Sequence, residues 1–185
     1  YIDFFIKIDE MRRKNIEFHF LLGNHDYWVQ DYIENTLMDN VYYEDAKINI
    51  NGKKFIITHG DGLLSWDHGY RILKRVIRSK LFIWLLRWLH PTLTYKLARF
   101  ISRSGYEDSS SMDNNQKVKD ELVDIALSHF NKDYEYMICG HYHLGEIFET
   151  KKGKLAVVGD WFHRPYYAIF DGEKLDLVNW TSNEE

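Results

Sequence analysis

Three short segments with one design constrain this chain more than any other feature of its sequence. Each is an apolar run that leads through glycine to side chains able to bind metals: LLGNHD at 21–26, IITHGD at 56–61 and MICGHYH at 137–143. Short apolar runs bounded by glycine predict buried strands. Since loops that leave the carboxyl ends of strands can converge at one edge of a sheet, the three segments predict a common site there.

The candidate ligands of that site are one amide and three imidazoles: Asn24, His59, His141 and His143. Two histidines at i and i+2 can point to opposite sides, and could serve two metals about 3.5–4 Å apart. Neutral imidazole suits Zn, Fe, Mn or Co, and an amide oxygen favours the harder ions. His25 would lie beside the metals, where it could act as a general acid. Asp26 and Asp61 could orient neighbouring imidazoles.

Each segment taken alone has a simpler interpretation. A single Gly-Asn-His-Asp is more often a turn after a buried strand, and a lone His-x-His more often lies on the surface or in a satisfied core. Recurrence after three predicted strands of one 185-residue chain favours a metal site. Three histidines lie outside this pattern, and we expect packing or surface roles for them: His19, His90 and His129.

The remaining pattern predicts a mixed α/β protein with strands in two sheets. Helical periodicity covers 3–15, with Phe4, Phe5, Ile8 and Met11 on one face, and 116–130. Asn51-Gly52 predicts a type I′ hairpin between 46–50 and 53–58. Further strands are expected at 16–22 and 136–139, and as an antiparallel tail at 146–150, 155–159, 166–170 and 175–180.

The segment 68–105 reads as a helical insertion that is both basic and aromatic. No acidic residue lies between Asp67 and Glu107, so this interval carries +9 while the net charge of the chain is −4. Its centre, LFIWLLRWLHP at 81–91, falls short of the roughly 18 apolar residues that span a bilayer. Such a segment can rest on a membrane surface or hold acyl chains. The alternative is a helical hairpin packed on the core with solvated basic residues.

GNHD, THGD and GHYH, in that order, resemble the last three motifs of the calcineurin-like metallophosphoesterases. The resemblance implies an α/β fold, a four-layer α/β/β/α sandwich that forms one domain over 1–185 with 68–105 as a helical lid. It also implies two divalent metal ions, usually Mn with Fe or Zn as alternatives, and a metal-activated water that attacks phosphorus. Asn24, His59 and His141 would bind one metal and His143 the other. His25 would be catalytic, stabilising or protonating the leaving group.

Two stretches around the insertion resemble, more narrowly, the UDP-2,3-diacylglucosamine pyrophosphatases of lipid A biosynthesis: HGDGLLSWDHGYRILKR at 59–75 and SRSGYEDSSSMDNNQ at 102–116. This implies a cytoplasmic hydrolase, peripheral on the inner face of the membrane, that yields the lipid 1-phosphate and UMP. Asp67, Tyr70 and Arg103 would bind the glucosamine-phosphate part of the substrate. The partners would be an anionic lipid or nucleotide-lipid and the membrane surface. No nucleic acid is expected, because the insertion is more apolar than backbone contacts need.

Two departures from the family keep other functions open. The family's first motifs, Asp-x-His and Gly-Asp-x-x-Asp, are absent, and Gly159-Asp160 comes too late in the chain to replace them. We expect an N-terminally truncated sequence whose 185 residues alone are inactive. His25 stands where the best-known lipid A members carry arginine. The alternatives are a phosphodiesterase or phosphatase acting on another nucleotide or phospholipid, and a non-catalytic sandwich module. The single cysteine, Cys139, indicates a reducing compartment.

Overall fold

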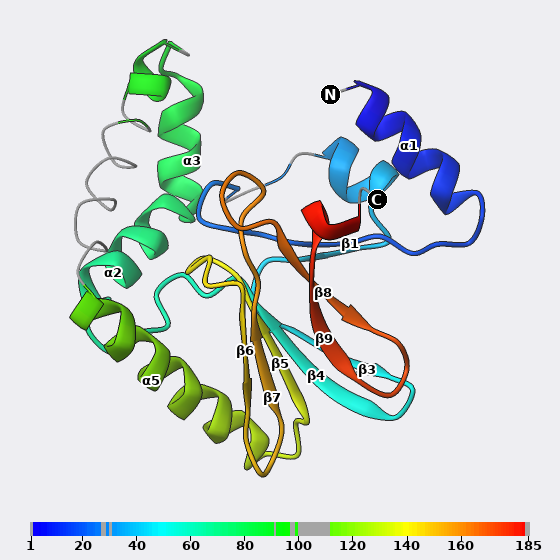
Figure 1. Cartoon of the computed structure of the whole chain (residues 1–185). Coiled ribbons are helices and arrows are strands. Elements are labelled where there is room, and N and C mark those ends of the chain that lie inside the picture. Colours follow the sequence, from blue (N-terminus) through cyan, green and yellow to red (C-terminus); the bar gives the residue numbers. More distant parts are fainter. Residues whose placement is uncertain are drawn as a thin grey trace. The chain divides into compact units, whose positions relative to one another are not determined.

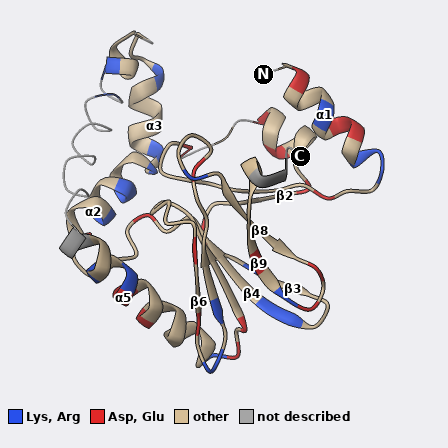
Figure 2. Cartoon of the chain, viewed as in Figure 1, with Lys and Arg blue, Asp and Glu red and all other residues tan. Residues whose placement is uncertain are grey.

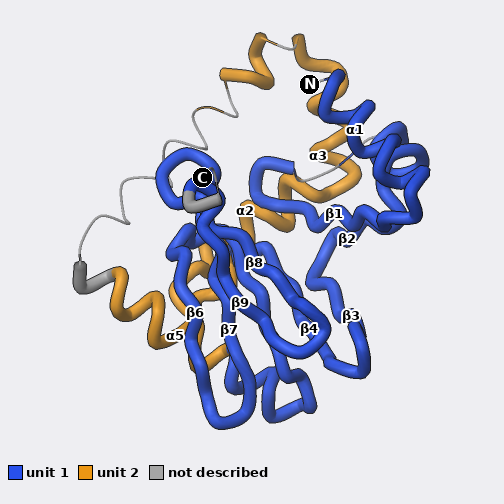
Figure 3. Tube along the Cα trace, turned by 45° about the vertical axis from the view of Figure 1, so that its right-hand side comes forward, with its two compact units in different colours: residues 1–61, 126–185 blue, residues 62–125 orange. Residues whose placement is uncertain are grey.

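The structure is a computed structural model, and it describes residues 2–26, 29, 31–90, 92–96, 99 and 112–183, without the side chains of 112–114 and 182–183. The chain divides into two compact units, which Figure 3 colours separately: one of residues 1–61 and 126–185, the other of residues 62–125. The first unit carries all the described strands, and the second carries helices of the predicted insertion.

The first unit is built on a five-stranded mixed sheet in the order β3-β4-β5-β7-β6 (Figure 1). Its strands are β3 (Ala46–Ile50), β4 (Lys53–Thr58), β5 (Tyr136–Cys139), β6 (Glu146–Glu149) and β7 (Lys154–Val157). β4, β5 and β7 run parallel to one another, and the two edge strands are antiparallel to their neighbours. The mixed α/β class predicted from the sequence is therefore confirmed.

The hairpin of β3 and β4 lies where the sequence predicts it. Asn51 and Gly52 both have positive φ angles, 51° and 82°, as a type I′ turn requires. The strand pairing runs from Ala46 opposite Ile57 to Ile50 opposite Lys53. Here a local turn signal fixed the register of the whole hairpin.

A second hairpin, β8 (Tyr166–Phe170) and β9 (Leu175–Asn179), packs on one face of this sheet. Phe55, Ala156 and Leu175 are buried together there, and Phe55 stacks on the ring of Tyr136 with centroids 4.7 Å apart. The predicted antiparallel tail is confirmed as two pairs, β6 with β7 and β8 with β9, which lie in separate sheets. The opposite face of the five-stranded sheet is also buried, since Met137, Cys139, Leu155 and Val157 are fully inaccessible to solvent.

A small parallel pair, β1 (His19–Leu21) and β2 (Asn40–Tyr42), completes the strands of this unit. α1 (Ile2–Arg12) precedes the pair, and a π-helical turn, η1 (Ile33–Leu37), lies within its connection. Ile8 of α1 is buried, whereas Phe4, predicted on the same face of the helix, is 62% exposed.

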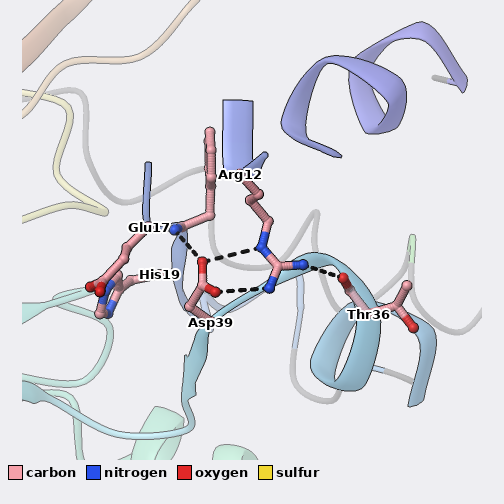
Figure 4. Close-up of polar contacts among 6 residues, drawn as sticks. Arg12, Glu17, His19, Thr36 and Asp39 are labelled. Atoms are coloured by element: carbon pink, nitrogen blue, oxygen red, sulfur yellow. Dashed lines mark hydrogen bonds and ion pairs between the residues drawn. The ribbon is translucent and has the colours of Figure 1, made fainter. Parts of the chain in front are cut away.

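Arg12 and Asp39 tie α1, η1 and the start of β2 together (Figure 4). The guanidinium donates to both carboxylate oxygens of Asp39, at 3.2 and 2.8 Å, and also to the backbone carbonyl of Thr36. Asp39 accepts a further bond, of 2.8 Å, from the backbone amide of Phe18. This paired arrangement holds the pKa of Asp39 below its usual value, chiefly through the bond from Arg12.

The second unit contains α2 (His68–Ile77), α3 (Lys80–Arg87) and the first part of α5 (Met112–Phe130), whose last turns belong to the first unit. Ser79 caps α3 by accepting a hydrogen bond from the amide of Phe82. The loop before α2 is fastened by Arg71, which donates to the carbonyls of Gly62, Leu64 and Ser65. The last described helical element, η2 (Trp180–Asn183), is a single turn that belongs to the first unit.

Candidate functional site

The candidate site lies in the first unit, where three chain segments leave the sheets. β4 ends at Thr58, which pairs with Cys139 at the end of the parallel strand β5. Because these two carboxyl ends share one edge, the next residues, His59 and Gly140–His143, emerge beside each other. Asn24 follows the third strand, β1, after the buried Leu22 and Gly23.

The structure brings three of the four predicted ligands together. Oδ1 of Asn24 lies 3.0 Å from Nε2 of His59, and the rings of His59 and His141 approach edge to face with centroids 5.4 Å apart. Gly23 allows this approach, because a Cβ atom there would stand 2.8 Å from Cε1 of His59. A larger residue at position 23 would therefore displace the imidazole.

The GHYH segment holds its histidines in an unusual backbone conformation. His141 and His143 have φ angles of 65° and 51°, in the left-handed region that residues other than glycine rarely adopt. Tyr142 between them donates a 2.9 Å hydrogen bond from its hydroxyl to the carbonyl of Gly60. Residues kept in sparsely populated conformations cluster at functional sites, where the surrounding structure holds them.

Burial makes His141 a neutral imidazole at physiological pH. Desolvation, followed by the neighbouring His59, lowers the pKa of His141 to about 4, against a smaller opposite effect of Asp61. Asp61 is buried. Its effect on the pKa of His141 is consistent with the prediction that it lies near the imidazoles. A neutral ring keeps a lone pair available, which is the form that binds metals.

Asn24 and His59 have the donor chemistry and the donor spacing that one metal ion would need, and the ring of His141 lies beside them. Two ligand atoms at right angles about a metal with bonds of about 2.1 Å are about 3 Å apart, close to the separation of Asn24 and His59. No group of three or more His, Cys, Asp or Glu side chains in the described part of the chain could hold a metal ion. The third donor of this cluster is the amide of Asn24, which is not one of those four residue types. For a second metal ion the 185 residues offer His143, but they lack the carboxylates of the absent motifs.

The other two residues of this region lie at its rim. His25 is exposed, and its small electrostatic effect on His141 indicates that it lies near the cluster. His143 is about half exposed, and its Nδ1 lies 4.0 Å from Oδ2 of Asp160. Sequence reasoning passed over Asp160 as a site residue, although VVGD at 157–160 repeats the pattern of a strand followed by glycine and a polar side chain.

The predicted substrate-binding residues belong to the other unit or lie outside the described residues. Asp67 precedes α2, and its carbonyl accepts the amide of Arg71 at 2.9 Å. Tyr70, in the first turn of α2, is partly buried with its ring against Gly62. Arg103 lies outside the described residues.

The described helices of the insertion are basic and expose apolar side chains. Lys and Arg recur along α2 and α3 (Figure 2), and neither helix contains an acidic residue. Trp84 and Trp88 contact edge to face and are 54% and 76% exposed. Within the described residues, no helix has the length and apolar character needed to cross a membrane.

Comparison with known proteins gives consistent relatives, although no family model matches the chain. A UDP-2,3-diacylglucosamine hydrolase of Porphyromonas gingivalis is 30% identical over 96% of this chain and 74% of its own length. The corresponding hydrolase of Psychromonas ingrahamii is 29% identical over 94% of this chain and 72% of its own. That of Shewanella putrefaciens is 28% identical, over 86% and 66%.

Proposed function

Because the chain belongs to the UDP-2,3-diacylglucosamine hydrolases, a calcineurin-like phosphoesterase family, we propose that it is a two-metal phosphohydrolase. Its proposed reaction cleaves the pyrophosphate of UDP-2,3-diacylglucosamine to give the lipid 1-phosphate and UMP. The observation that carries this proposal is the cluster of Asn24, His59 and His141 at the strand ends. Those side chains are the donors that the family resemblance assigns to one metal.

Divalent ions, with Mn as the first candidate and Fe or Zn as alternatives, would supply an activated water and neutralise phosphoryl charge. The proposed roles of the chain's own residues follow from their positions. Asn24, His59 and His141 hold one ion with neutral donors, and His143 contributes to the other. His25, exposed at the rim, donates a proton to the leaving oxygen. Asp67, Tyr70 and Arg103 are proposed to bind the glucosamine-phosphate part.

We extend the proposal to the architecture. The two packed β layers of the first unit are those expected at the centre of an α/β/β/α sandwich. In this proposal residues 1–185 form one such domain, and residues 68–105 are its helical lid. The described part of that lid offers cations and exposed tryptophans to an anionic lipid at a membrane surface. A cytoplasmic location on the inner face of the membrane fits this role and the single cysteine.

His25 favours a second candidate function. Arginine at this position is the feature of the best-known lipid A members, and histidine is common in general phosphoesterases. A phosphodiesterase or phosphatase acting on another nucleotide or phospholipid would use the same metal cluster. A non-catalytic module would instead keep the fold without binding metal, and the absence of Asp-x-His and Gly-Asp-x-x-Asp from the 185 residues favours it.

Metal binding by the chain separates the enzymatic from the non-catalytic hypothesis. We expect calorimetry with Mn²⁺ or Zn²⁺ to show binding that His59→Ala weakens at least about tenfold, since it removes a ligand. His19→Ala is the control, because His19 contacts Tyr42 and Glu17 instead of the cluster. A folded chain that binds neither ion would support the non-catalytic module and contradict the proposal.

The substrate is tested with the complete reading frame that contains these residues. We expect Mn-dependent release of UMP from UDP-2,3-diacylglucosamine, and its loss in His59→Ala. Hydrolysis of a generic phosphodiester without UMP release from the lipid substrate would contradict the proposed substrate and support the second candidate.

A further inference from the structure

Asp160 uses its two carboxylate oxygens for different purposes. Oδ1 accepts hydrogen bonds from the backbone amides of Phe162 and His163, each 2.7 Å long, and so fixes the loop that joins β7 to β8. The other oxygen, Oδ2, lies 4.0 Å from Nδ1 of His143. One side chain therefore connects the loop with a proposed metal ligand.

The carboxylate is well placed to act on an imidazole. The Asp160 side chain is only 16% exposed, and its ion pairs among the described residues are with His143 and His163. His163 is 83% exposed and screened by water, whereas His143 is about half exposed.

The loop cannot easily move away from His143. Gly159 donates to the carbonyl of Tyr166 at 2.9 Å, and the guanidinium of Arg164 donates to the carbonyl of Leu144 at 3.2 Å. A Cβ atom at Gly159 would overlap the carbonyl of Arg164, so the two sides of the loop are in close contact. The loop and the segment that carries His143 are thus fastened to each other beside Asp160.

We propose that Asp160 is a positioning residue for His143: its Oδ2, 4.0 Å from Nδ1, stabilises the ring form with hydrogen on Nδ1 and directs Nε2 toward a divalent metal ion. This inference rests on the proposed function, which makes His143 a ligand. Carboxylates that receive the second ring N–H of a ligating histidine fix its tautomer and orientation, and their removal typically lowers metal affinity about 10–100-fold.

Asp160→Asn separates this role from the capping of the loop, because asparagine keeps an Oδ1 acceptor and loses the charge. Asp171→Asn is a matched control. Asp171 accepts the amides of Glu173 and Lys174 in the same way, at 2.8 and 2.7 Å, and makes no ion pair with a histidine among the described residues. Both variants should unfold at nearly the wild-type temperature.

The first measurement is the ¹⁵N spectrum of the His143 ring in the metal-free chain at a fixed pH of about 8, where an ordinary imidazole is neutral. We expect hydrogen on Nδ1 in the wild type and in Asp171→Asn, and a shift of the tautomer population toward hydrogen on Nε2 in Asp160→Asn. An unchanged His143 spectrum in Asp160→Asn would overturn the proposal.

The second measurement adds Zn²⁺ alone and follows the same Nε2 resonance. In the wild type we expect it to shift at Zn²⁺ concentrations about 10–100-fold lower than in Asp160→Asn. If Zn²⁺ leaves His143 unaffected in the wild type, the metal-directing part of the inference is overturned, whereas the proposed function is tested separately at His59 by calorimetry. The tautomer measurement then still decides whether Asp160 positions the ring. Equal Zn²⁺ responses in the two proteins would overturn the metal-directing part of the inference.

Discussion

At the scale of single residues, the accessibility of Cys139 measures how well the end of β5, next to the candidate site, is shielded from solvent. Its side chain is fully buried at the end of β5, directly before the GHYH segment. Burial raises the pKa of the thiol, with smaller contributions from Asp45 and Asp61. The reactive thiolate is therefore scarce and inaccessible in the folded chain.

We expect Cys139 to resist thiol reagents until the chain unfolds. With Ellman's reagent in native buffer the labelling should be negligible, and one thiol per chain should react in concentrated guanidinium chloride. The denatured sample is its own control for reagent and concentration. Rapid stoichiometric labelling of the folded protein would show that the edge of the sheet opens readily and would contradict this shielding of Cys139.

The candidate site was predictable residue by residue only in part. The pattern of a strand, a glycine and a ligand type pointed to Asn24, His59 and His141, because side chains that follow parallel strands meet at one edge. The link from His143 to Asp160 depends on a loop that returns from β7, and its path is set by packing that no local pattern encodes. For the same reason the exposure of Phe4 was missed: its periodicity is helical, and which face is covered is a tertiary property.

At the scale of elements, the ion pair between Arg12 and Asp39 holds α1 to η1 and β2. Arg12→Ala should lower the unfolding temperature measurably, since it removes three hydrogen bonds and leaves Asp39 without its cation. Arg13→Ala is the matched control. Arg13 pairs with Asp9 on the exposed side of the same helix, where such pairs contribute little. Equal unfolding temperatures for the two variants would contradict the importance of the pair between Arg12 and Asp39.

The same pair makes a prediction about pH. Because the folded pKa of Asp39 is lowered, its stabilising effect is present above the ordinary aspartate value of about 3.9 and is lost as pH falls through the folded pKa. The difference in unfolding temperature between wild type and Arg12→Ala should therefore be full at pH 7 and shrink below about pH 4.

Elements with strong local signals were predicted better than those fixed by long-range pairing. The hairpin at Asn51-Gly52 and the strand β5 match their predicted bounds, since a turn type and a short apolar run specify them. η1 and β2 were not predicted, because residues 31–42 carry no clear periodicity and β2 is defined by its pairing with β1. The sequence did not indicate how the tail strands divide between sheets: β6 and β7 join the five-stranded sheet, whereas β8 and β9 form a separate pair.

At the scale of the whole molecule, one segment of the chain has a charge of opposite sign to the net charge. The chain carries −4 overall, yet the interval between Asp67 and Glu107 carries +9. Attraction to an anionic surface depends on the local patch within a Debye length, about 10 Å at 0.1 M salt, more than on the total charge. A protein that is acidic as a whole can thus bind an acidic surface through one segment.

We therefore expect the chain to sediment with vesicles that contain phosphatidylglycerol and to remain in solution with pure phosphatidylcholine vesicles. The double variant Arg75→Glu/Arg87→Glu changes two exposed cations of α2 and α3 and should reduce binding several-fold. Lys14→Glu/Lys132→Glu makes the same change in net charge at exposed positions of the other unit and should bind as the wild type does. Equal losses in both variants would attribute binding to net charge and contradict a basic lid surface.

The left-handed backbone at His141 and His143 has a consequence for laboratory evolution. Glycine adopts positive φ at no steric cost, and asparagine does so more readily than most residues, so either would relax these two positions. A library selected for heat resistance alone should accumulate them at 141 and 143, and each gain would remove an imidazole. These two positions would then mark where resistance to heat and the capacity to hold an ion are traded against each other.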